Sequence, residues 1–201
     1  MTSDTSRRSF LLSALAVTGT MLAPLPAQAL TEARARGLVD QVVADINAAI
    51  DSSGSQAAMI GEFERLFGRY ADVGIIARST LGADARSLSN AQMRAYTEAF
   101  RGYVARKYGK RFNEFRGGRI EVNTVREVKS WHEVRSTAYL PGQSPFEVRF
   151  LVSDRSGQDK FFDLFIEGIS LRLSEREEIG AMLDRRNGNI DALIQDLRSA
   201  G

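Results

Sequence analysis

The chain has 201 residues, a formal net charge of +2 and no cysteine. The absence of cysteine excludes disulfides, thiolate metal sites and cysteine nucleophiles, and the near balance of charges gives no case for a nucleic-acid partner. A chain of this length can bury a sizeable core.

The first 29 residues have the order of a bacterial export signal. A twin-arginine motif, Ser6-Arg7-Arg8-Ser9-Phe10-Leu11-Leu12, precedes an apolar run over 10–23 and the small-x-small sequence Ala27-Gln28-Ala29. The apolar run is shorter than the roughly 20 residues that span a bilayer, and no cysteine follows it for lipid attachment. We therefore expect residues 1–29 to be a cleaved twin-arginine signal peptide and residues 30–201 to be a single domain, soluble in the periplasm.

The first half of the expected mature chain predicts helices, because its apolar residues recur three or four positions apart. The fourth helix has the strongest start signal, a capping box in which Ser89 and Gln92 bond each other's backbone. Its apolar stripe continues to Phe115, before Gly117-Gly118. The four predicted helices cover residues 31–52, 55–70, 73–81 and 89–115.

After Gly118 the apolar period changes from 3.6 to 2, which predicts strands. Short turn signals such as Pro141-Gly142 join them into an antiparallel meander. Two C-terminal helices follow, starting at Ser174 and Ile190. The fold class is therefore α+β, with the N-terminal helices on one face of a four-stranded or slightly larger antiparallel sheet. The predicted strands cover residues 120–128, with a bulge near 124, then 133–140, 146–152 and 161–173.

Few residues carry the pattern of a catalytic or metal site. His132 is the only histidine, and beside Trp131 at a strand start we expect it to lie at the surface. Asp163 and Glu167, four residues apart on one strand, would lie about 13 Å apart, too far for the carboxylate pair of a glycosidase. We predict no catalytic residue, no cofactor and no metal ligand.

Large apolar side chains from two helices face an apolar side of the sheet. Such walls either interlock as a core or stand apart around a cavity, and without further information a core is the better interpretation.

Several stretches, taken in order, resemble the MlaC family of periplasmic phospholipid-binding proteins, also described as the toluene-tolerance family. They are RYADVGIIARSTLG (69–82), LSNAQ (88–92), FRGYVARKY (100–108), FDLFIEGISL (162–171) and IDALI (190–194).

The resemblance implies a cavity between helices and sheet that takes phospholipid acyl chains. It also implies a carrier, not an enzyme, that shuttles lipid between an outer-membrane lipoprotein complex and an inner-membrane ABC transporter complex. Together with the apolar pattern, it predicts ten lipid-binding residues: Phe67, Tyr70, Ile76, Phe100, Tyr103, Val134, Phe150, Phe162, Leu164 and Ile166.

Two alternatives remain. One is a carrier of another envelope lipid, such as a hopanoid. The sequence pattern of such a carrier would not differ from that of a phospholipid carrier. The other is an enzyme, because helices on a curved sheet in an NTF2-like arrangement also host isomerases that use a tyrosine and an acid in an apolar cone. Tyr103 and Asp163 would then be the candidates, although Asp163 alternates with Phe162 and Leu164 and so is expected to point away from the cavity.

Overall fold

The computed structural model describes residues 29–52 and 54–201. The predicted signal peptide thus lies outside the described residues, apart from Ala29. The described helices are α1 (Glu32–Ser52), α2 (Gln56–Tyr70), α3 (Val73–Leu81), α4 (Asn90–Gly109), α5 (Leu171–Arg185) and α6 (Ile190–Ser199), with short 3-10 helices η1 (Asp84–Arg86) and η2 (Phe112–Phe115). The strands are β1 (Arg119–Val128), β2 (Trp131–Tyr139), β3 (Phe146–Ser153), β4 (Lys160–Ile166) and β5 (Ile169–Ser170).

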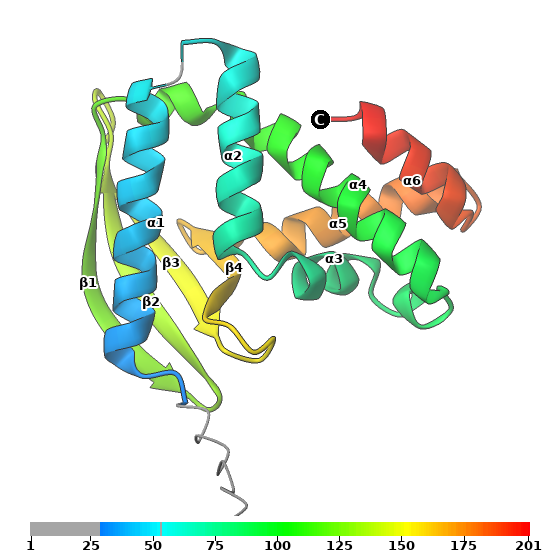
Figure 1. Ribbon diagram of the computed structural model, residues 1–201, viewed down its shortest axis with the longest axis horizontal. Coiled ribbons are helices and arrows are strands. Elements are labelled where there is room, and N and C mark those ends of the chain that lie inside the picture. Colours follow the sequence, from blue (N-terminus) through cyan, green and yellow to red (C-terminus); the bar gives the residue numbers. More distant parts are fainter. Residues whose placement is uncertain (1–28, 53) are drawn as a thin grey trace, which may run out of the picture.

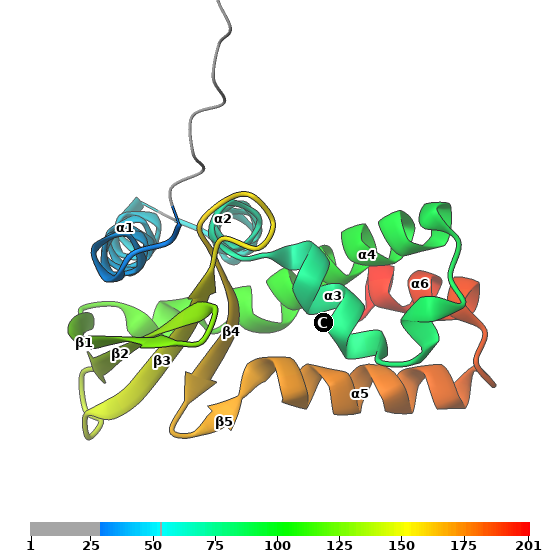
Figure 2. The same cartoon turned by 90° about the horizontal axis from the view of Figure 1, so that it is seen from below.

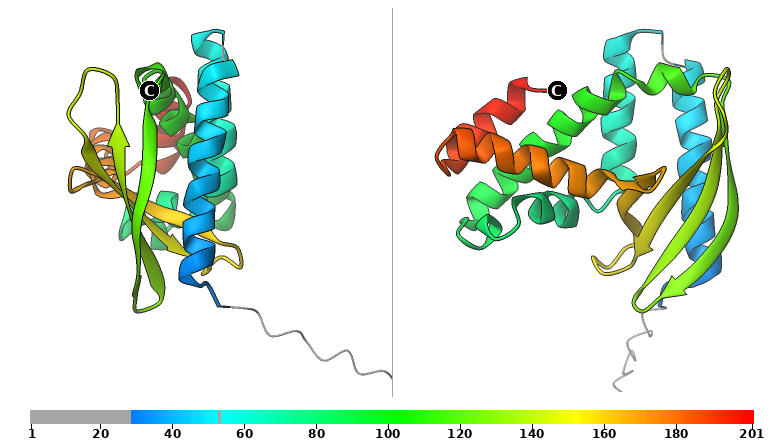
Figure 3. Two further views of the ribbon diagram at one scale, coloured as in Figure 1. Left: turned by 90° about the vertical axis from the view of Figure 1, so that its left-hand side faces the viewer. Right: turned by 180° about the vertical axis from the view of Figure 1, so that it is seen from behind.

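The helices divide into two groups around a curved sheet (Figures 1 and 3). Figure 2 shows α1 and α2 on the same face of the sheet, while α3, α4, α5 and α6 stack beside it. Helix α1 packs on β1 and β2, and α2 packs on α4. The predicted α+β class, with helices on one sheet face and two helices at the C-terminus, is confirmed.

The sheet is the predicted antiparallel meander, in the order β1-β2-β3-β4-β5. Its predicted bulge in β1 is present between Val122 and Thr124. A second bulge lies in β4, because Val152 pairs with Phe161 while the preceding Leu151 pairs with Asp163. The bulge leaves Phe162 as the extra residue and interrupts the alternation of faces along β4.

Three element ends differ from the prediction by three residues or more. The last strand ends at Ile166, because Glu167 and Gly168 have φ values of 50° and 82° and turn the chain back. The Ser170 side chain accepts a hydrogen bond from the Leu173 N–H (3.0 Å), so α5 starts before Ser174. Helix α4 ends at Gly109, and the aromatic stripe beyond it continues in η2.

The buried residues form two apolar cores. The first, which we call the helical core, is built mainly from α3, α4, α5 and α6. The second, the sheet core, is built from α1, α2 and the inner face of the sheet. Phe63 and Phe161 pack against both cores and so lie at their boundary.

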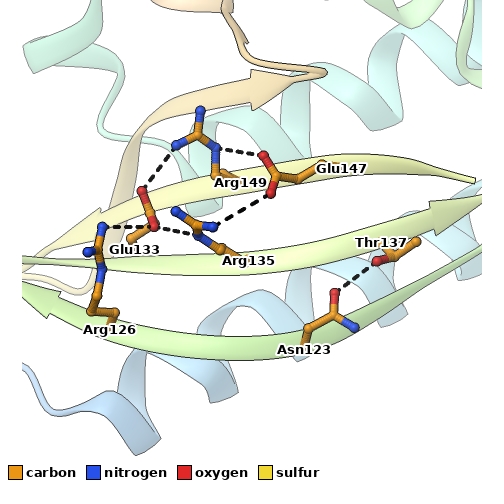
Figure 4. Close-up of polar contacts among 7 residues, drawn as sticks. All are labelled: Asn123, Arg126, Glu133, Arg135, Thr137, Glu147 and Arg149. Atoms are coloured by element: carbon orange, nitrogen blue, oxygen red, sulfur yellow. Dashed lines mark hydrogen bonds and ion pairs between the residues drawn. The ribbon is translucent and has the colours of Figure 1, made fainter.

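The outer face of the sheet carries a cluster of charges around Glu133, which is buried on the solvent side of β2 (Figure 4). The Glu133 carboxylate accepts hydrogen bonds from Arg126 (3.3 Å), Arg135 (2.7 Å) and Arg149 (3.2 Å). Burial alone would raise the pKa of Glu133. Hydrogen bonding from Arg135 and the charges of the three arginines outweigh burial and hold that pKa below its usual value.

This lowered pKa predicts a contribution to stability that depends on pH. A carboxyl group whose pKa is lower in the folded state stabilises the fold above its unfolded pKa and loses that contribution as pH falls through the folded value. We expect wild type to lose more stability between about pH 5 and about pH 3 than Glu133→Gln does, as measured by urea unfolding. Equal losses in the two proteins would contradict this role of Glu133.

His132 is buried in β2, contrary to the expected surface position. Its register partners are Glu127 and Val152, and Val152 belongs to the sheet core. Side chains alternate faces along a strand, so His132 lies on the helix-covered face that Val134 also occupies. Its place next to the β1–β2 turn does not expose it.

Candidate functional site

A cavity of about 700 Å³ lies between the helices and the inner face of the sheet. Its walls come from α1, α2, α3, α4, η2, the strands β1, β3, β4 and β5, and the first turns of α5. Most of its lining is aliphatic or aromatic, including Leu66, Val104 and Val148. A space of this size and character is typical of a site for an apolar small molecule.

Most of the residues predicted from sequence to bind lipid line this cavity, namely Phe67, Tyr70, Ile76, Phe100, Phe150, Leu164 and Ile166. They come from α2, α3, α4, β3 and β4, which the fold brings together. On the sheet, Phe150 is paired with Leu164, so both side chains are on the inner face. Their role in binding lipid stays a prediction.

The other three predicted residues do not line the cavity. Tyr103 belongs to the helical core, where its hydroxyl donates to Glu178 of α5 (2.7 Å). Val134 is fully buried in the sheet core. Phe162 is the extra residue of the β4 bulge and packs edge-on against Trp131 (ring centroids 6.0 Å apart), while Phe161 packs against Phe150 on the inner face.

Several aromatic residues of the lining were not among the predicted site residues. Phe63 continues the α2 stripe of Phe67 and Tyr70, so its spacing could have identified it. The apolar pattern predicted Phe112 and Phe115 at the end of the fourth helix. In the structure both residues lie in η2, beyond the end of α4. Phe161 takes the position that strict alternation assigned to Phe162, and no sequence signal marks that bulge.

Part of the polar lining lies on exposed connections. Gln143 and Ser144 are in the β2–β3 loop, Glu114 is in η2, and Glu167 is in the β4–β5 turn. Ile169, also in the lining, is 63% exposed. We call these exposed polar residues, together with Ile169, the mouth of the cavity.

A partly buried polar cluster, which includes the lining residues Tyr108 and Glu175, lies at one wall of the cavity. The Lys107 ammonium contacts Glu175 (2.7 Å) and Glu178, and the Tyr108 hydroxyl also donates to Glu175. Burial and hydrogen bonding to the acidic partner raise the pKa of Tyr103 and of Tyr108 well above the usual value. Both phenols therefore stay protonated and act as hydrogen-bond donors that hold α5 against α4.

The carboxylate of Asp163, whose side chain is 0% exposed, is fully engaged in structural bonds. It accepts from the Ser170 hydroxyl (2.8 Å), from the Leu164 N–H (2.8 Å), and from both the backbone N–H (3.2 Å) and Nε (3.3 Å) of Arg172. Asp163 thereby ties β4 to the first turn of α5. The fold does not pair it with Tyr103, whose hydroxyl donates to Glu178, so the tyrosine–acid pair of the enzyme alternative is not assembled.

The sequence of most of the chain matches a protein-family model. The sequence model of the MlaC protein family matches residues 36–199. The chain belongs to the MlaC family. None of the helices described in this MlaC-family chain has an apolar stretch long enough to cross a membrane.

A similar solved structure is that of the phospholipid-binding protein from Ralstonia solanacearum in complex with a phospholipid. Its fold matches this MlaC-family chain with a TM-score of 0.71, over 81% of this chain and 94% of the other. The sequences are 19% identical, so the similarity is one of fold.

Proposed function

We propose that this MlaC-family protein is a periplasmic phospholipid carrier and not an enzyme. The observation that carries the proposal is the apolar cavity of about 700 Å³, which opens through a polar mouth. Acyl chains would occupy the space between α2, α4 and the inner face of β3 and β4, and the headgroup would remain at the mouth. The phospholipid in the structurally similar Ralstonia protein supports the choice of ligand class.

The energetics of transfer agree with a carrier. Burying a methylene group is worth about 0.8 kcal/mol, so two chains of about 16 carbons represent roughly 25 kcal/mol of gross transfer. A lipid therefore does not leave a membrane for water at a useful rate without an apolar site to receive it. A protein with such a site and a mouth open to solvent supplies that environment.

We further propose that the protein exchanges lipid with an outer-membrane lipoprotein complex and an inner-membrane ABC transporter complex. Membership of the MlaC family supports these partners. The export motif at Arg7-Arg8 and the Ala27-Gln28-Ala29 sequence support a periplasmic location. Cleavage after Ala29 would leave residues 30–201 as one lipid-binding domain.

The proposal is tested by purifying the protein from the periplasm of its native cells. Mass spectrometry of an organic extract should find phospholipid bound to the protein, and N-terminal sequencing should find Leu30 first. A hopanoid in the extract would replace the proposed ligand class, and an extract with no lipid would contradict the carrier function.

Replacement of both Arg7 and Arg8 by lysine should prevent export, and normal export of this variant would contradict the twin-arginine route.

A further inference from the structure

We propose that the mouth of the cavity discriminates between headgroups by charge, accepting zwitterionic phospholipids and disfavouring anionic ones. This inference rests on the proposed function and adds the class of lipid to it. It starts from the charged residues of the lining, of which two are basic and four acidic. They are Arg111, Glu114, Asp163, Glu167, Arg172 and Glu175.

Both arginines of the lining already have acidic partners. Arg111 donates from Nε and Nη2 to the two carboxylate oxygens of Glu114, at 3.1 and 3.2 Å. Arg172 is bound to the buried Asp163 through its backbone N–H and Nε. Each arginine charge is therefore balanced within the lining, and neither offers an uncompensated positive charge to a lipid phosphate.

The two remaining lining acids leave an excess of negative charge. Glu167 is exposed in the β4–β5 turn and has no ion-pair partner among the described residues. Glu175 contacts Lys107, but the same ammonium also contacts Glu178. The charge of Arg185 also acts on Glu178, so Lys107 and Arg185 together balance the two carboxylates of this cluster. The excess negative charge of the lining is therefore that of Glu167 at the mouth.

This charge acts where the headgroup must lie. The deeper lining is apolar, so the acyl chains belong there and the headgroup belongs among the exposed residues of the mouth. A zwitterionic headgroup has no net charge and places a cation near the acidic mouth, whereas phosphatidylglycerol has a net negative charge. Like charges repel, and the effect at exposed groups decreases as salt screens them.

The test uses purified, delipidated protein incubated with vesicles of equal parts phosphatidylethanolamine, phosphatidylcholine and phosphatidylglycerol with identical acyl chains. Total lipid per protein and the proportion of each headgroup are measured after re-isolation. At low salt we expect phosphatidylglycerol to be depleted by about threefold relative to each zwitterionic lipid, and less so at high salt. Total loading reports the proposed function, and the headgroup proportions report this inference.

The double variant Glu114→Gln/Glu167→Gln removes two negative charges from exposed positions of the mouth. It should raise the proportion of phosphatidylglycerol to parity or above, whatever the total amount of lipid bound. The matched control, Glu32→Gln/Glu127→Gln, removes the same charge from exposed positions at the opposite end of the sheet, beside the start of α1 and the β1–β2 turn. This control should keep the wild-type preference.

Three results would overturn the inference while leaving the carrier function intact. These are full loading with phosphatidylglycerol at parity or above in wild type, an unchanged preference in the mouth variant, and an equal loss of preference in the control. A protein that takes up no lipid at all would instead contradict the carrier function itself.

Discussion

Replacing Val148 with tryptophan is expected to reduce phospholipid loading by about tenfold or more. Val148 lies on β3 in the cavity lining, paired with Ile166, so an indole at this position would occupy space proposed for acyl chains. Displacing only two methylene groups costs about 1.6 kcal/mol at 0.8 kcal/mol each, which already exceeds the factor of ten in affinity that 1.4 kcal/mol represents. Loading is measured as lipid phosphorus per protein after exposure to vesicles.

Thr124→Trp is the matched control. Thr124 is exposed on β1 and pairs with Arg135, which belongs to the charge cluster on the outer face of the sheet. The same indole then lies outside the cavity, and loading should match wild type. Val148→Trp should keep a thermal midpoint near that of wild type, because its side chain enters existing space. Normal loading of a folded Val148→Trp protein would place the lipid elsewhere.

Asp163→Ala is expected to lower the free energy of unfolding by about 3 kcal/mol, because the donors around this buried carboxylate lose their acceptor. The substitution leaves the Ser170 hydroxyl and the Arg172 side chain without their shared acceptor. It also removes the acceptor of the Arg172 N–H in the first turn of α5. Chemical denaturation followed by circular dichroism gives the change.

Two control variants distinguish the stability cost of removing a buried carboxylate from the cost of removing any acidic side chain. Asp159→Ala breaks an ion pair with Arg34 near the surface, where Asp159 is 20% exposed, and should cost less than about 1 kcal/mol. Asp163→Asn keeps one carbonyl oxygen as an acceptor and should cost less than Asp163→Ala. A stability loss at Asp163→Ala no larger than at Asp159→Ala would show that the buried contacts contribute little.

Elements whose boundaries depend on local chemistry were predictable. Asp72 accepts a hydrogen bond from the Ile75 N–H and Gly82 follows the last turn, so both ends of α3 were correct. The capping box of Ser89 and Gln92 is formed as expected. The end of β4 was not predictable from alternation, because the chain turns at Glu167, a residue without strong preference for a positive φ.

The cavity itself was harder to predict because one apolar pattern is compatible with two environments. On α4, Phe100 and Val104 line the cavity, whereas Tyr103 between them is buried against α5. Helix α4 contacts α2, α3 and α6, so its apolar residues cover a wide arc and do not mark a single face. The distance between the packed elements determines which side of that arc faces empty space. A sequence pattern does not specify this distance.

The wall of the cavity includes the boundary between the two cores, so a displacement of one core against the other would change its volume. Phe63 and Phe161 pack against both cores and also line the cavity, so part of the cavity wall lies at this boundary. Close-packed interiors resist compression, but two such bodies can slide against each other while each keeps its own contacts. A docking partner that shifts the helical core by a small distance would therefore reduce the cavity volume and release the ligand without unfolding any part of the protein. Release would then be a mechanical event driven by binding.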